Sequence, residues 1–121
     1  MSRINKENAK NILSNVPEKK NFLVNDGRVL RNLQDLSAAL ADISEETFAH
    51  HVNNEKNDFR SWIEYVVGDK KLANGIAKIK SKELMLKKVD KRISQLNSLI
   101  KWGEKYGNEK FSFELWRGMQ L

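Results

Sequence analysis

The chain contains no cysteine among its 121 residues. Disulfide bonds, thiolate metal sites and cysteine nucleophiles are therefore excluded, and the lack of cysteine favours a reducing, intracellular environment. No window approaches the roughly 18 consecutive apolar residues of a membrane-spanning helix, and the N-terminus lacks the apolar run of a secretory signal. These absences predict a soluble, cytoplasmic protein that does not enter a membrane.

Proline and clustered glycine are also scarce. Pro17 is the single proline, and the six glycines never cluster, so the chain has no glycine-rich loop of the kind that cradles phosphate groups. A length of 121 residues predicts one domain. Within it we expect a polar basic arm over residues 1–20, a hairpin with helices over residues 21–102, and an aromatic tail over residues 103–121.

What the chain does have is charge, which 31% of its residues carry, with a formal net charge of +6. The two signs are segregated along the sequence. Residues 1–31 hold seven Lys and Arg against three acids, residues 32–69 hold two against eight, and residues 70–121 hold thirteen against five. An acidic middle between basic flanks can pair with itself, within one chain or between copies, or present a basic face to a nucleic acid.

The apolar pattern predicts a mainly helical (α+β) fold. Two short β-prone runs flank Asn25-Asp26-Gly27, and Asp-Gly is typical of hairpin turns because the turn requires positive φ. Helix starts are predicted at residues whose side chains can cap a helix: Asn32, Ser44, Asn57 or Asp58, Asp69 and Ser81. We therefore expect an N-terminal β-hairpin packed on a bundle of about four to five helices.

The pattern from Asp69 to about Trp102 is helical and favours two helices joined near Ser81 over one continuous helix. The second helix carries apolar residues at the 3, 4, 3, 4 spacing of a heptad seam: Leu86, Val89, Ile93, Leu96 and Ile100. Such a seam either faces the core of its own domain or pairs with a second copy of the chain.

The C-terminal segment is expected to leave this helix, because Gly103 and Gly107 follow it. Residues 111–116 alternate between apolar and polar side chains as a strand does. This segment could supply a third strand to the hairpin, or dock on another chain by strand addition. The interface candidates within it are Phe111, Phe113 and Trp116.

The least ordinary stretch is HHVNNEKNDFRSW, residues 50–62, which holds both histidines. On a continuous helix His51, Asn54 and Asp58 would share one side, but a zinc site requires three or four His, Cys, Asp or Glu ligands. Adjacent histidines also point about 100° apart on a helix, and no nucleophile motif accompanies them. We expect no catalytic residue, metal or cofactor here.

This stretch is better interpreted as a corner between two helices. A helix that ends near Asn53 and another that begins near Asn57 leave backbone groups without partners, and Asn, Asp and His side chains can satisfy them. The predicted structural corner consists of His51, Asn57, Asp58, Phe59 and Trp62.

Residues 48–73 fit the spaced pattern FxxHVNxxKNDFxxWIxxVxGDxxLA. Together with the hairpin and the leucine-rich helix before it, the run from Phe22 to about Leu96 resembles a small uncharacterised domain family that is best represented in archaea. The resemblance implies a compact, mostly helical domain that often ends in a charged helix, and it implies no activity or cofactor. Gly75 departs from the strong helix former expected at its position.

Two functions are compatible with these features. The first is a non-enzymatic protein-interaction module that forms homo-oligomers through the heptad seam, the aromatic segment or both. The alternative is a DNA- or RNA-binding protein, nucleoid- or ribosome-associated, with an arm at Arg3, Lys6 and Lys10. Its phosphate contacts would come from Lys78, Lys80, Lys82, Lys87, Lys88, Lys91 and Arg92. No small-molecule substrate is expected.

Overall fold

The computed structural model describes residues 5–106. Over that range the chain forms six α-helices and a two-stranded antiparallel hairpin, with one 3-10 turn (η1) and one π-helical turn (η2). The elements in chain order are α1 (Lys6–Leu13), η1 (Glu18–Lys20), β1 (Phe22–Leu23), β2 (Val29–Leu30), α2 (Leu33–Asp42), α3 (Glu45–His51), α4 (Asp58–Trp62), η2 (Ile63–Val67), α5 (Lys70–Ile76) and α6 (Lys82–Tyr106). The predicted mainly helical fold with an N-terminal hairpin is confirmed. None of these described helices is long and apolar enough to cross a membrane.

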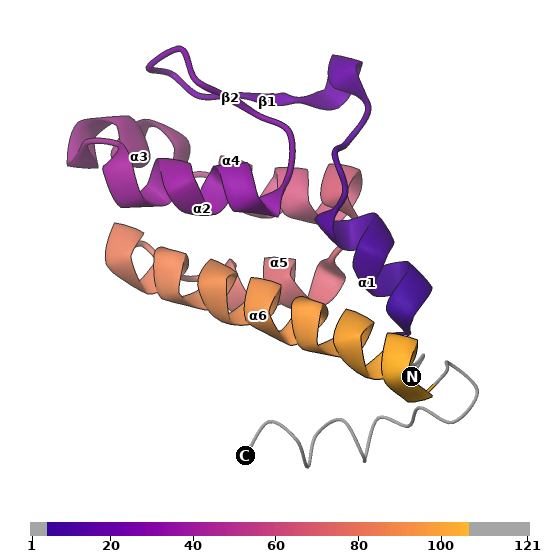
Figure 1. The fold of residues 1–121 in the computed structure, drawn as a ribbon. Coiled ribbons are helices and arrows are strands. Elements are labelled where there is room, and N and C mark those ends of the chain that lie inside the picture. The colour runs from indigo at the N-terminus through magenta and orange to yellow at the C-terminus, as the bar shows by residue number, and fades with distance from the viewer. Residues whose placement is uncertain (1–4, 107–121) are drawn as a thin grey trace.

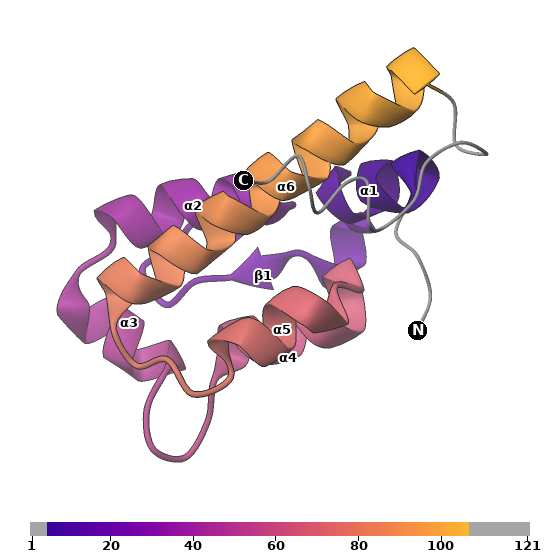
Figure 2. The ribbon, with the colours of Figure 1, turned by 90° about the horizontal axis from the view of Figure 1, so that it is seen from below.

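The elements stack in levels. Figure 1 shows the hairpin above α2 and α4, with α6 below them and α1 beside the far end of α6. Seen from below, α6 runs across the molecule with α5 on one side and α2 on the other (Figure 2), and α6 contacts α1, α2 and α5. The apolar side chains buried between these levels form one continuous core.

The hairpin turns where the Asp-Gly signal predicts it. Phe22 pairs with Leu30 and Leu23 with Val29, and Gly27 has a φ of 101°, which side chains other than glycine rarely tolerate. Leu30 is buried against the helices, whereas Leu23 and Val29 are 68% and 49% exposed on the outward face. A hairpin this small depends on the helices beneath it for stability.

The helix starts agree with the capping signals. A side-chain oxygen of each cap accepts a hydrogen bond from a backbone N–H in the first turn, which satisfies one of the unpartnered donors there. The caps are Asn32 for α2, Ser44 for α3, Asn57 for α4, Asp69 for α5 and Ser81 for α6. Residues 69–102 accordingly form two helices that separate before Ser81, as predicted.

Between α4 and α5 the helix widens into the π turn η2. The Gly68 N–H donates to the Ile63 carbonyl five residues earlier, at 2.8 Å, and Gly68 ends the turn with a φ of 88°. A π turn holds one residue more per hydrogen-bonded loop than an α-helix. It therefore determines the direction in which the next residue, Asp69, faces.

A buried ion pair joins α5 to α6. Asp69 and Arg92 are 2% and 3% exposed, and Arg92 donates from Nε to Oδ2 at 2.7 Å and from Nη2 to Oδ1 at 3.0 Å. The same carboxylate caps α5 by accepting from the Leu72 N–H at 3.2 Å. Two-pronged pairing of this kind fixes orientation as well as distance, so the rotation of α6 about its axis is set here.

This rotation corrects the predicted seam. The fully buried side of α6 consists of Met85, Val89, Arg92, Leu96, Leu99 and Gly103, whereas Leu86, Ile93 and Ile100 are partly buried at its border. The seam therefore faces the core of its own domain. The buried stripe lies about one position away from the predicted one because Arg92, a charged residue, occupies the core side.

Two expected boundaries also differ from the structure. Residues 6–13 form α1, which contacts α6 and buries Ala9 completely, so the N-terminal segment is more than the expected polar arm. Helix α6 continues through Gly103 to Tyr106, and Gly103 is buried in it. Lys10 of α1 lies 3.9 Å from the neighbouring Glu104, which places this glycine near the contact with α1. The predicted strand over 111–116 lies outside the described residues.

Candidate functional site

His51 lies at the centre of the corner between α3 and α4, and it is 5% exposed. Its Nε2 accepts a hydrogen bond from the Asn25 backbone N–H at 2.9 Å, and its Nδ1 lies 3.0 Å from Asp58 Oδ2. Because a backbone N–H can only donate, Nε2 carries no proton and Nδ1 carries it toward the carboxylate. The ring thus connects the hairpin turn to the start of α4.

Aromatic contacts hold the hairpin to the same corner. The ring centroid of Phe22 in β1 lies 5.1 Å from that of His51, 5.0 Å from that of Phe59 and 5.8 Å from that of Trp62. The indole Nε1 of Trp62 donates to the Lys20 carbonyl at 2.9 Å, so the N-terminal end of β1 is also tied to α4. These contacts give every predicted corner residue a defined structural partner, with Asn57 as the cap of α4.

The arrangement of His51 and Asp58 looks like a base with its orienting carboxylate. The nitrogen that would receive a proton, Nε2, is already hydrogen-bonded to a backbone N–H of the hairpin. Using it as a base would require breaking that bond. Among residues 5–105, no group of three or more His, Cys, Asp or Glu side chains is placed to hold a metal ion.

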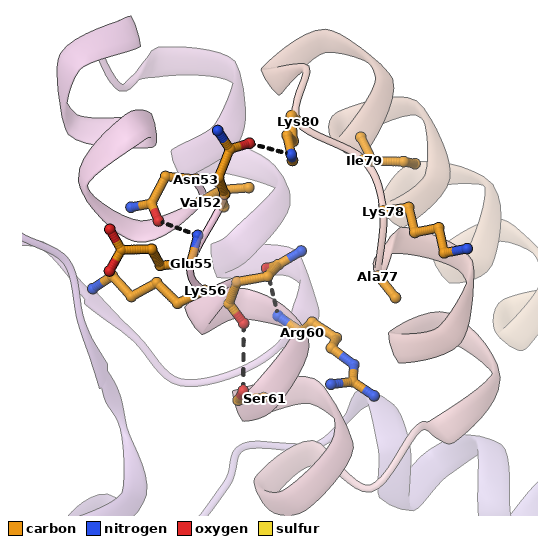
Figure 3. A pocket seen from close by; sticks show the side chains of 12 residues that line it. Val52, Asn53, Glu55, Lys56, Arg60, Ser61, Ala77, Lys78, Ile79 and Lys80 are labelled. Atoms are coloured by element: carbon orange, nitrogen blue, oxygen red, sulfur yellow. Dashed lines mark hydrogen bonds between the residues drawn. The ribbon is translucent and has the colours of Figure 1, made fainter.

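Beside the corner, on the outer side of α4, lies a pocket of about 600 Å³. One wall is the loop from Val52 to Asn57 with Arg60 and Ser61 of α4, and the other is the α5–α6 connection, residues 77–80. Figure 3 shows the two walls facing each other. Lys80 of one wall donates a hydrogen bond to Asn54 Oδ1 of the other. This pocket is the candidate binding site of the described part of the chain.

Four cationic side chains line the pocket: Lys56, Arg60, Lys78 and Lys80. Lys56 is paired with Asp58 at 2.9 Å and Arg60 lies 3.3 Å from Glu64. Lys78 and Lys80 pair with no acid of the described residues. Both carry a positive charge that no acid of the described residues neutralises, so the pocket can attract an anion.

Two of the predicted nucleic-acid contacts are not available to a phosphate. Arg92 is buried against Asp69, which corrects its place in that set. Lys82 donates to the Ile43 carbonyl at 2.7 Å and lies 3.8 Å from Glu45. Lys87, Lys88 and Lys91 are exposed on α6, and Lys78 and Lys80 line the pocket, so the remaining five occupy two places.

The predicted interface residues fall into three groups: fully buried residues, partly buried residues, and residues outside the described range. Val89 and Leu96 are fully buried, and Leu86, Ile93 and Ile100 pack against the core from its border. Phe111, Phe113 and Trp116 lie outside the described residues. The exposed large apolar side chains of the described range are instead Leu23, Val29, Tyr65 and Leu84.

Sequence reasoning found the residues of both pocket walls but not the pocket. Asn54 belongs to the unusual stretch and Lys80 to the basic segment, 26 positions later. Nothing in local spacing signals that these two loops meet. Their meeting follows from α4 and α5 packing against each other, which is a property of the tertiary fold. The Asn25 N–H, a backbone partner of His51, was likewise not identifiable from residue types.

Comparison with known proteins shows that most of the chain matches one family. The model of a family of unknown function, DUF5752, matches residues 15–98, which include the hairpin, the corner, both pocket walls and most of α6. No curated protein and no solved structure matches the chain.

The His51 contacts generate a stability prediction. Replacing His51 with Leu leaves the Asn25 N–H and the Asp58 carboxylate without this partner, so we expect the free energy of unfolding to fall by about 1–3 kcal/mol. The matched control is His50→Leu, because His50 is the exposed neighbour and its replacement should change stability by less than about 0.5 kcal/mol. Urea unfolding of both variants measures this, and equal losses would contradict the role of His51.

Asp58 generates a prediction about pH. Burial raises the pKa of the Asp58 carboxyl, but hydrogen bonds from His51 and Lys56 together with the charge of Lys56 outweigh it, so the pKa lies below its usual value. Such a carboxyl stabilises the fold above the unfolded pKa of about 4, and this contribution is lost as the pH falls through the lower folded pKa.

We therefore expect wild-type protein to lose thermal stability as the pH falls below about 4, and Asp58→Asn to lose less over the same interval. Glu55→Gln is the control, since Glu55 is an exposed carboxylate and its profile should follow the wild type. Melting temperatures across the pH range measure the difference. If the melting temperatures of the wild type and Asp58→Asn fell in parallel with pH, the stabilising role of ionised Asp58 would be refuted.

Proposed function

We propose that this chain, which belongs to the family of unknown function DUF5752, is a non-enzymatic protein-interaction module that associates with further copies of itself. The observation that supports it best is the outward face of the hairpin, where Leu23 and Val29 lie directly opposite each other and are 68% and 49% exposed. A cytoplasmic location, the spaced signature as a family mark and a mainly archaeal family remain predictions from the sequence.

The hairpin offers a surface to which another chain can add. It has two strands in the described structure, and an uncovered sheet edge can accept a strand from a second molecule. We propose that residues 111–116 of another copy supply that strand. Their alternating apolar side chains Phe111, Phe113 and Leu115 would extend the apolar face of Leu23 and Val29, at about 0.2–1 kcal/mol for each cross-strand pair.

The test is the molar mass in solution, measured by light scattering across a concentration series. We expect wild-type protein to form dimers or larger assemblies, and Leu23→Lys and Phe113→Ser each to shift the mass toward the monomer, because each removes one side of the same contact. Tyr65→Lys is the matched control, since Tyr65 is 75% exposed and belongs to η2 and not to the hairpin. A wild-type protein that is monomeric throughout, or an equal effect of Tyr65→Lys, would refute the proposal.

A second candidate function is nucleic-acid binding, supported by three exposed lysines in one short segment of α6, Lys87, Lys88 and Lys91. They have no ion-pair partner among the described residues. With Lys78 and Lys80 they could contact five phosphates. Arg92 and Lys82 are excluded from this count by their contacts within the fold.

Five phosphate contacts on duplex DNA predict that the logarithm of the binding constant falls with the logarithm of salt concentration with a slope of about −4.5. Replacing Lys87 and Lys91 with Gln should reduce that slope by about 2. Replacing the exposed pair Lys19 and Lys20 with Gln removes the same charge elsewhere and should leave the slope unchanged. Gel-shift titrations at several salt concentrations measure it, and no binding at low salt would refute this function.

A further inference from the structure

The pocket between the α3–α4 loop and residues 77–80 has an unequal supply of donors and acceptors. Lys80 donates to Asn54 Oδ1, which leaves the Nδ2 of Asn54 without a hydrogen-bond partner among the described residues. Lys78 has no ion-pair partner there and is exposed. Unused donors in one pocket match a ligand that offers acceptors.

The side-chain amide oxygens that line the same pocket are already engaged. Asn53 Oδ1 accepts from the Glu55 N–H at 2.9 Å, and Asn57 Oδ1 accepts from the Arg60 N–H at 3.0 Å. Glu55 is the acid among the lining residues, and in Figure 3 its side chain extends on the side of the loop away from residues 77–80. A ligand that brings donors would therefore find few partners here.

The ion pairs around the pocket indicate the charge of the ligand. Lys56 and Arg60 have acidic partners, whereas Lys78 and Lys80 have none among the described residues. Two unneutralised positive charges match a phosphate monoester, which carries about −1.5 to −2 at neutral pH. Charge-assisted hydrogen bonds to such a group are roughly twice as strong as neutral ones.

The size of the pocket indicates what carries the phosphate. About 600 Å³ far exceeds one phosphate ion and lies within the range of about 300–1,000 Å³ that is typical of small-molecule sites. Val52, Ala77 and Ile79 supply apolar surface within the lining, beside which the rest of an organic molecule can lie.

We propose that this pocket binds a small organic phosphate monoester, with Lys78, Lys80 and the Asn54 amide holding the phosphate. The proposal is independent of self-association through the hairpin, whose residues are absent from the pocket lining. It also goes beyond the expectation from the sequence, in which no small-molecule ligand was foreseen.

Isothermal titration calorimetry with AMP and with ribose 5-phosphate tests the proposal, with adenosine as the compound that lacks the phosphate. We expect at least one phosphate compound to bind and adenosine not to bind. The double replacement Lys78→Gln and Lys80→Gln should weaken binding by about tenfold or more, since it removes both unneutralised charges. Asn54→Asp should have the same direction of effect, because it adds a negative charge to the pocket and occupies Lys80.

The matched control is Lys87→Gln with Lys88→Gln, which removes equal charge from exposed positions on α6 and should leave the affinity within about twofold. Melting temperatures of all variants show that each is folded. Two results would overturn the proposal: neither phosphate compound binds at millimolar concentration, or the control pair weakens binding as much as the pocket pair, which would indicate diffuse attraction to a basic protein.

Discussion

The pair between Asp69 and Arg92 is the constraint on which the rest of the architecture depends. Both groups are almost completely removed from water, and a buried charge without its partner costs several kcal/mol. The two helices that carry them, α5 and α6, therefore cannot separate or rotate independently. Because Asp69 also caps α5, one carboxylate determines where α5 begins and which side of α6 faces inward.

Much of the fold could be predicted because it is written in local chemistry. Asn32, Ser44, Asn57, Asp69 and Ser81 each mark a helix start through a hydrogen bond within three residues, and the Asp-Gly turn requires only its own backbone. Hydrogen bonds between residues so close in the sequence form in the same way whatever the tertiary fold around them. The existence and order of the elements follow from them.

What could not be predicted depends on partners distant in the chain. Arg92 was interpreted as a surface residue because arginine is rarely buried, and only the presence of Asp69, 23 positions away, reverses that expectation. The pocket also depends on residues distant in the sequence, since Asn54 and Lys80 meet only after α4 and α5 have packed. Without an aligned set of sequences, one chain gives no sign of such pairs.

The corner and the pocket share the same short loop, with opposite consequences for its two sides. On the inner side His51, Phe59 and Trp62 hold the hairpin through aromatic and hydrogen-bond contacts. The outer side is left with polar groups whose own positions are fixed by caps and turns, as for Asn53 and Asn57. A ligand would meet a surface that is already ordered, which lowers the entropy lost on binding.

The π turn η2 lets the chain hold one residue more between Ile63 and Gly68 than an α-helix would. Tyr65 lies there with its side chain in solvent, so its replacement would disturb no packing. The length of the segment matters more, because each α-helical residue turns the chain by about 100° and advances it by about 1.5 Å. A one-residue deletion between Ile63 and Val67 would let the Gly68 N–H keep its bond to the Ile63 carbonyl with ordinary α-helical spacing, and Asp69 would still face Arg92. A second deletion would turn Asp69 away, so the segment accepts the loss of one residue but not of two.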